Sequence, residues 1–310
     1  MKPQDVTNTP GVHAIFMVFG LRDGDDAVDT VKGFCGDFPA VAKSLRTRLP
    51  DCATSCVMGF GSDAWDKLFP DHGKPKELTA FQEIKGAKHT AVSTPGDLFF
   101  HIRSSRLDVC HEAAAIISAA LQEAVYPIDE VQGFRYFDGR AIIGFVDGTE
   151  NPEDEERASS ATIGDEDADF AGGSYAFVQK YMHDMNAWNG LSTEEQEKAI
   201  GRRKFNDVEL GDDEKPENAH NAVTNIEDAD GNELKIVRAN MPFANPAKGE
   251  FGTYFIGYAG TFTTTHKMLE NMFIGEPVGN TDRLLDFSTA VTGTLFFVPS
   301  GEMLEELGED

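Results

Sequence analysis

The chain of 310 residues has a mass of 33.9 kDa, which favours about two domains. Its hydrophobic content of 40% and its 23 phenylalanines can fill packed cores, so an intrinsically disordered chain is excluded. The 27 basic and 53 acidic residues give a formal net charge of -26, which argues against nucleic acid and anionic membrane surfaces as partners, since both attract basic proteins.

The first half of the chain alternates between the hydrophobic periods of strands and helices. The apolar block at 13–20 ends in Gly and is typical of a buried strand. From 25 to 49, apolar residues recur every three or four positions, which predicts an amphipathic helix that Pro50 ends. The predicted order is a strand at 13–20, a helix at 25–49, strands at 55–61 and 97–103, a helix at 108–126 that Pro127 ends, and a strand at 133–137.

The second half repeats this order. It contains a strand at 175–181, a helix at 193–200, strands at 234–237 and 253–258, a helix at 263–273 and a strand at 294–298. Each half is a β-α-β-β-α-β unit, the pattern of ferredoxin-like folds. The sequence therefore predicts an α+β fold of two ferredoxin-like domains, residues 1–148 and 149–310, with antiparallel sheets arranged as in dimeric α+β barrels.

No segment has the features of a membrane span or a secretion signal. Stretches of about 18 consecutive apolar residues do not occur, and residues 1–10 lack the apolar core of a signal peptide. The four cysteines fit reduced thiols. We therefore expect a cytoplasmic protein without a membrane partner.

One candidate site is the segment GFVDGTENP at 144–152. Asp147 follows an apolar run and precedes Gly148, so its carboxylate would lie on a rigid element just where the chain leaves the sheet. The alternative is that Asp147 only caps the turn through its own backbone. The residues alone favour this structural role.

A second candidate site combines AHNAVTN at 219–225 with LKIVRANMP at 234–242. Arg238 and Asn240 are two positions apart on a predicted strand, so they share one face and can bind an oxygen species or a carboxylate. A strand end paired with the acidic surface is the alternative for Arg238. His220 lies in a polar segment, and nothing in its spacing distinguishes it from a surface histidine.

Together these segments resemble the dye-decolourising peroxidase (DyP-type haem peroxidase) family. The likeness continues, in family order, through GGSYAFVQ at 172–179, IGRRK at 200–204 and GTYF at 252–255, and so covers nearly the whole chain. The absence of large insertions and the Asn two residues after Arg238 are similar to the B-type branch. The resemblance implies two ferredoxin-like domains with one haem b in the second.

The resemblance also assigns roles to individual residues. It implies that His220 is the proximal ligand of the haem iron, with Asp147, Arg238 and Asn240 as catalytic residues on the distal side. Arg202 would pair with a haem propionate. Phe255, Met268 and Met272 would make apolar contacts to the haem.

The implied activity is that of a haem b peroxidase. It would reduce hydrogen peroxide and oxidise dyes, phenols or other one-electron donors through a ferryl intermediate, as a homo-oligomer. One alternative is a haem-handling protein for storage, delivery or iron release with little peroxidase activity. Another is a ferredoxin-like binding module without a cofactor.

Two further expectations concern the electron donors. Bulky donors would react at a haem edge or at surface aromatic residues, although packing is the more common role of such residues. The acidic surface would attract cations such as Mn(II), for which Glu233 is a candidate ligand. The aromatic candidates for electron relay are Trp65, Trp188, Tyr136, Tyr181 and Tyr258.

Overall fold

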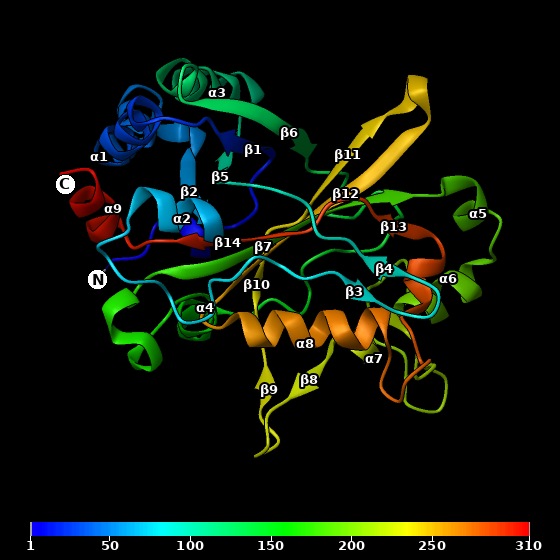
Figure 1. Cartoon of the computed structure of the whole chain (residues 1–310). Helices are drawn as coiled ribbons and strands as arrows, with labels where there is room; N and C mark the ends of the chain where they lie inside the picture. Colours follow the sequence, from blue (N-terminus) through cyan, green and yellow to red (C-terminus); the bar gives the residue numbers. More distant parts are fainter. Residues whose placement is uncertain (1, 310) are drawn as a thin grey trace.

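Antiparallel strands and flanking helices form both halves of the chain in the computed structural model, which describes residues 2–309 apart from the side chains of residues 154 and 155 (Figure 1). The first half runs β1 (His13–Leu21), α1 (Asp25–Arg48), β2 (Ser55–Gly61), β5 (Leu98–Ser104), α3 (Leu107–Leu121) and β6 (Val125–Phe134). The second half contains β7 (Ser174–His183), β10 (Val237–Arg238), β12 (Glu250–Ala259), α8 (Phe262–Phe273) and β14 (Thr294–Val298).

The strand order is the same in the two halves. It is β6-β1-β5-β2 in the first half and β14-β7-β12-β10 in the second, so each unit has its four strands in the order 4-1-3-2. All neighbouring pairs are antiparallel. Strand β14 also pairs with β2, which joins the halves in one continuous sheet. The predicted fold class, α+β with two ferredoxin-like units, is confirmed.

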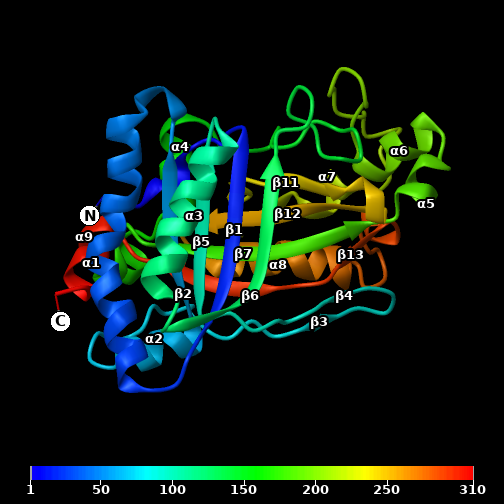
Figure 2. The ribbon, with the colours of Figure 1, turned by 90° about the horizontal axis from the view of Figure 1, so that it is seen from above.

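The sheet curls so that its inner face encloses a core of its own. Strands β1 and β12 are not neighbours in the sheet, yet the rings of Phe16 and Tyr254 stack with centroids 4.2 Å apart. On the outer face, α1 and α3 cover the first half and α8 covers the second (Figures 1 and 2). Strands buried on both faces are therefore apolar at successive positions, as in the run at 13–20.

Each half contributes a segment that packs on the other half. The connection that holds β3 (Ile84–Lys85) and β4 (Thr90–Ala91) crosses to α8, and its Phe81 ring lies 4.8 Å from that of Phe177. At the other end of the chain, α9 (Gly301–Leu307) packs against α1. These exchanges bury apolar residues of the two halves in one common core.

The structure corrects two predicted elements. Helix α3 ends at Leu121, not near 126, and Pro127 lies inside β6, which begins well before 133. β6 is an edge strand and its pairing with β1 shifts register beside Pro127, so the missing proline N–H is tolerated there. The predicted strand at 234–237 is divided between β9 (Glu233–Leu234), which pairs with β8 (Ile226–Glu227), and β10.

Short elements in the long connections were not predicted. They include α2 (Ser62–Leu68), α4 (Asp154–Ala161), α5 (Met185–Asn189), α7 (His220–Thr224), β11 (Met241–Asn245) and β13 (Ser288–Ala290), with 3-10 turns at Asp5–Thr7, Pro50–Cys52, Asp165–Phe170, Pro246–Lys248 and Arg283–Asp286. The predicted helix at 193–200 is present as α6 (Thr193–Ile200). Within residues 2–309, no helix has the length and apolarity that crossing a bilayer requires.

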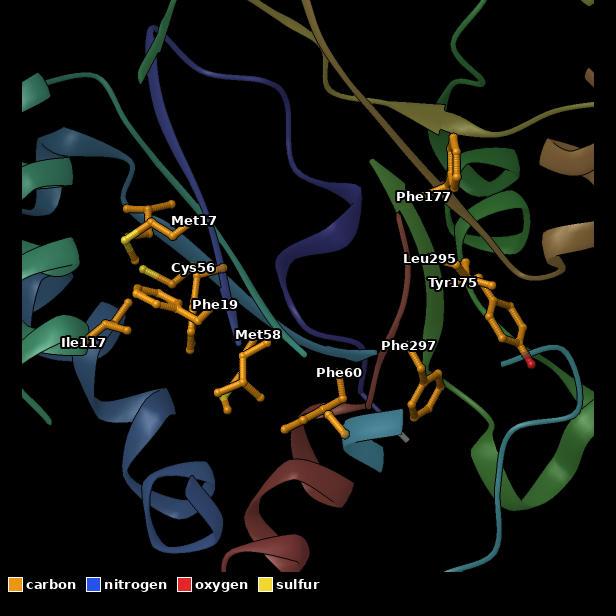
Figure 3. Packing of buried hydrophobic residues seen from close by; sticks show 14 of the residues in the cluster. Met17, Phe19, Cys56, Met58, Phe60, Ile117, Tyr175, Phe177, Leu295 and Phe297 are labelled. Atoms are coloured by element: carbon orange, nitrogen blue, oxygen red, sulfur yellow. The ribbon is translucent and has the colours of Figure 1, made fainter. Parts of the chain in front are cut away.

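Phe297 on β14 lies where the two halves join, and its truncation is expected to be strongly destabilising. Its side chain is fully buried and contacts the rings of Trp65 and Tyr175 (Figure 3 shows it beside Phe60). We expect Phe297→Ala to lower the free energy of unfolding by about 3–5 kcal/mol, because it leaves a cavity. Phe205→Ala, at a side chain that is 80% exposed, should change it by less than about 0.5 kcal/mol. Urea unfolding measures both, and equal effects would contradict the prediction.

Candidate active site

A cavity of about 1030 Å³, with the open solvent at its mouth included, lies in the second half of the chain. Its walls come from the segment after β6, from β7 and β12, from α7 and α8, and from the segments around β10 and β13. Aliphatic and aromatic side chains form most of these walls, and the polar groups are few. This is the usual constitution of a site for a large flat or apolar ligand.

His220 begins the short helix α7 and lines this cavity. Its Nδ1 lies 2.6 Å from Oδ2 of Asp282, a fully buried residue. The other oxygen of Asp282 accepts a hydrogen bond from the backbone N–H of Leu284, at 2.8 Å, so the carboxylate is held in place. With Nδ1 bonded, Nε2 of His220 is the ring nitrogen left to bind a metal. The sequence did not identify Asp282, which is 62 residues from His220.

Asp147 and Asn240 also line the cavity and are bonded to each other. The Asn240 amide Nδ2 donates to Oδ1 of Asp147 at 3.2 Å, while its Oδ1 accepts from the backbone N–H of Ile256 at 3.1 Å. The second bond fixes which end of the amide points at the carboxylate. Asp147 therefore does more than cap a turn: its side chain is one of the polar groups of the cavity.

Arg238 is the cationic group of the cavity wall. Burial lowers the pKa of its guanidinium, and the charges of Asp147, Glu150 and Glu233 oppose that effect. An arginine keeps its proton even so. Its Nε is buried and has no hydrogen-bond partner among the described residues. Arg238 is thus a polar group of the same, mainly apolar cavity that the bonded pair of Asn240 and Asp147 lines.

The predicted apolar contacts lie on the same cavity. Phe255 reaches it from β12, whereas Met268 and Met272 reach it from α8, where their spacing of four residues puts them on one helix face. Met272 is 9% exposed. All three remain predicted contacts of the cofactor.

Arg202 is the one predicted site residue that does not line the cavity. Its guanidinium is bound by carboxylates, with Nη1 2.5 Å from Oε1 of Glu150 and Nε 3.0 Å from Oδ1 of Asp207. In this arrangement its charge is already compensated. The propionate contact of Arg202 stays a prediction, and it requires these ion pairs to open.

His183 is a cavity residue that the sequence did not point to. Its Nδ1 lies 2.8 Å from Oγ of Ser288 and its Nε2 lies 2.9 Å from Oγ1 of Thr253, so both ring nitrogens are bonded. Burial lowers the pKa of His183 to about 4. The ring is therefore neutral at pH 7 and contributes no charge to the cavity.

This burial predicts a loss of stability in acid. Because the unfolded chain takes up a proton on His183 below about pH 6.5 and the folded chain only near pH 4, stability falls as the pH falls through this window. We expect His183 to lower the free energy of unfolding by about 2 kcal/mol between pH 7 and pH 5. Urea unfolding of His183→Gln should show a pH dependence smaller by this amount. His111→Gln, at an exposed position, should match the unaltered protein, and equal pH dependence in all three would contradict the prediction.

Comparison with known proteins identifies the family. A model described as Dyp-type peroxidase, N-terminal, matches residues 4–135, and one described as Dyp-type peroxidase, C-terminal, matches residues 138–303. The chain belongs to the Dyp-type peroxidase family. A dye-decolorizing peroxidase of Mycolicibacterium paratuberculosis is 52% identical to this peroxidase over 306 residues, which cover 99% of the chain and 86% of the relative.

Solved structures of Dyp-type peroxidases have the same fold over the whole chain. The enzyme of Bacteroides thetaiotaomicron is 66% identical, with a TM-score of 0.96 and coverage of 99% of this chain and 98% of that one. A DypB variant of Rhodococcus jostii in complex with heme is 51% identical, with a TM-score of 0.96 and coverage of 99% and 98%. The predicted peroxidase activity is thereby confirmed, and the comparisons do not support a haem-handling protein with little such activity.

Glu233 lies in a smaller polar pocket of this peroxidase, next to the cavity. Glu150 and Glu209 also line it, and Arg238 borders both spaces. The Glu233 carboxylate is 3.4 Å from Nζ of Lys235. Among the described residues, no group of three or more His, Cys, Asp or Glu side chains is placed to hold a metal ion. Binding of Mn(II) by Glu233 therefore stays a prediction.

Most of the aromatic residues expected to relay electrons are not at the surface. Trp188 is completely buried and donates from Nε1 to the carbonyl of Ile143, at 2.9 Å. Trp65, Tyr181 and Tyr258 are also buried, and only Tyr136 of the five is partly exposed. Four of the five therefore have the packing role that is more common for such residues, and electron relay through any of them stays a prediction.

Proposed function

We propose that this peroxidase binds haem in the cavity, with Nε2 of His220 as the protein ligand of the iron. The observation that carries the proposal is the His220–Asp282 pair. Asp282 occupies Nδ1 of the ring and so leaves Nε2 for a ligand of the mainly apolar cavity that His220 lines. A buried carboxylate on the far ring nitrogen raises the basicity of a ligating histidine. The heme complex of the Rhodococcus jostii relative supports the same cofactor.

Haem held by His220 would supply the redox-active iron and the oxidising equivalents that pass to the electron donors. Asp147 is the group that moves the proton. Its carboxylate would accept a proton from one oxygen of hydrogen peroxide and return it to the other oxygen, which leaves as water. The bond from Asn240 to Oδ1 of Asp147 leaves Oδ2 for this transfer.

Arg238 and Asn240 prepare the site for charge. The buried guanidinium of Arg238 would stabilise the negative charge that develops on the departing oxygen. Asn240 adds a dipole without adding charge, and its orientation is fixed by the N–H of Ile256. Because these groups are in place before peroxide binds, they need little rearrangement during the reaction.

Hydrogen peroxide and small one-electron donors are the proposed partners, and dyes or phenols donate electrons at the mouth of the cavity. We also propose that the chain works in the cytoplasm as a homo-oligomer. The cysteines Cys35, Cys52, Cys56 and Cys110 are free and buried, which fits a reducing compartment. Light scattering of the purified protein measures its molar mass in solution. The mass of a monomer at all protein concentrations would refute the proposed homo-oligomer.

One experiment tests the proposed function directly. The absorption spectrum of the purified protein is recorded with haem, and again after one equivalent of hydrogen peroxide. We expect a Soret band that peroxide changes within the mixing time and that a donor dye restores. Haem uptake without a response to peroxide would favour the haem-handling function. Absence of haem uptake would exclude both this function and the peroxidase function.

Mn(II) is proposed as one of the donors. A DypB variant 51% identical to this chain, with a TM-score of 0.96, has been solved in complex with manganese. In this chain the acidic pocket that contains Glu233 adjoins the cavity. Glu233→Gln should raise the KM for Mn(II) by about threefold or more, because a negative charge near the cation is lost. The KM for a neutral dye should not change, and Glu123→Gln, at an exposed position of the other half, should change neither.

A further inference from the structure

We infer that Asn151 is a positioning residue of this peroxidase, which holds the main chain of Arg238 so that its side chain lines the same cavity as Asp147. The inference deepens the proposed function and rests on it. Asn151 belongs to the same turn as Asp147, but it does not line the cavity. It lines a separate open pocket behind the turn, together with Gly148 and Thr149. It therefore acts through Arg238 and not by touching peroxide.

The side-chain amide of Asn151 binds both backbone groups of Arg238. Its Oδ1 accepts from the N–H of Arg238 at 2.7 Å, and its Nδ2 donates to the carbonyl of Arg238 at 2.9 Å. The amide thus replaces the strand partner that Arg238 lacks on this side. β10 is the last strand of the sheet path, and Ala239 next to Arg238 donates to Ile256 on β12. Alternation along the strand turns the N–H and C=O of Arg238 to the open edge.

The two catalytic segments are bonded to each other reciprocally. Asn151, from the turn of Asp147, holds Arg238, and Asn240, from the segment of Arg238, holds Asp147. The turn itself is tight, since the N–H of Asn151 donates to the carbonyl of Gly148 at 3.1 Å and Gly148 has φ +85°. The two hydrogen bonds from the Asn151 side chain to the backbone of Arg238, called the Asn151 clamp below, therefore start from the same short turn as Asp147. The spacing between the carboxylate and the guanidinium is thereby set within one small unit.

The guanidinium needs such support because little else holds it. Nε of Arg238 is buried without a hydrogen-bond partner among the described residues. Its place therefore depends on its main chain and on packing. A shift of about 1 Å in a group that acts on the reacting atoms can cost about a hundredfold in rate. Loss of the Asn151 clamp permits a shift of this kind.

The test compares Asn151→Ala with Asn186→Ala, a matched change at an exposed asparagine of α5. In stopped-flow mixing with hydrogen peroxide, we expect Asn151→Ala to lower the second-order rate constant by about tenfold to a hundredfold, with haem affinity unchanged. In an Arg238→Leu background the same change should cost less than about twofold, because the group it positions is gone. Equal losses in both backgrounds, or no loss, would overturn the inference.

A second readout does not depend on haem. Hydrogen exchange of the Arg238 amide in the haem-free protein should accelerate about tenfold in Asn151→Ala and stay unchanged in Asn186→Ala. Unchanged exchange of the Arg238 amide would overturn the inference about Asn151 even if the proposed haem site is correct. Faster exchange in a protein that binds no haem would refute only the proposed function. If Asn151→Ala does not fold, Asn151→Asp keeps the acceptor for the Arg238 N–H and should lose an intermediate part of the rate. A full rate in Asn151→Asp together with unchanged exchange at the Arg238 amide would likewise overturn the inference.

Discussion

Arg238→Leu is expected to slow the reaction with hydrogen peroxide by about two to three orders of magnitude. Leu preserves part of the apolar stem of Arg238 but removes the cation that lines the cavity together with Asp147. The departing oxygen then loses the positive charge that would stabilise it. Rapid mixing of the haem-loaded variant with peroxide measures the effect as a second-order rate constant.

Two companion variants separate the role of charge from other effects. Arg238→Lys keeps a positive charge but not the planar group, so its rate should lie between those of Arg238→Leu and the unaltered protein. Arg48→Leu, at an exposed position near the end of α1, should react at the normal rate. Because His220 and Asp282 are untouched, the haem affinity of Arg238→Leu should also be normal. A rate within twofold of normal for Arg238→Leu would refute the assignment.

His220→Ala is expected to lower haem affinity by about a hundredfold or more, because the protein then offers no imidazole nitrogen to the iron from α7. Titration of the haem-free variant with haem, followed by the Soret absorption, measures this loss. Added imidazole should restore the spectrum, since it can occupy the space that the side chain leaves. His111→Ala, on the exposed side of α3, is the matched control and should bind haem normally.

Asp282→Asn tests the same pair from its other side. The amide can still meet Nδ1 of His220, but it carries no charge to raise the basicity of the ring. Haem affinity should fall by about tenfold to a hundredfold, which is less than in His220→Ala. If His220→Ala and Asp282→Asn both bound haem normally, the iron ligand would have to be another residue.

The fold was largely predictable because its periodicities are local. The apolar stripe predicted at 25–49 requires only neighbours three or four residues apart, and the helix is present as α1. The prediction failed where a distant contact decided the outcome. Pro127 ends a helix in most local contexts, yet here the pairing of β6 with β1 makes it part of a strand.

The resemblance of sequence motifs to the family named Asp147, His220, Arg238 and Asn240, and the fold brings all four to one cavity. Their partners were not visible in the sequence. Asp282 is 62 residues from His220, and Asn151 is 87 residues from Arg238. His183 gave no signal either, because a histidine inside a strand looks the same whether its ring meets solvent or two hydroxyl groups.

The acidic composition and the repeated β-α-β-β-α-β order were determined by the sequence itself, because charge is additive and strand or helix patterns depend on near neighbours. Only the tertiary structure decided which carboxylates compensate Arg202, which one orients His220 and which amide holds Arg238. These choices depend on how the two curled halves of one sheet close on each other. Hydrogen bonds act over about 3 Å, so they are set by this closure and not by separation along the chain.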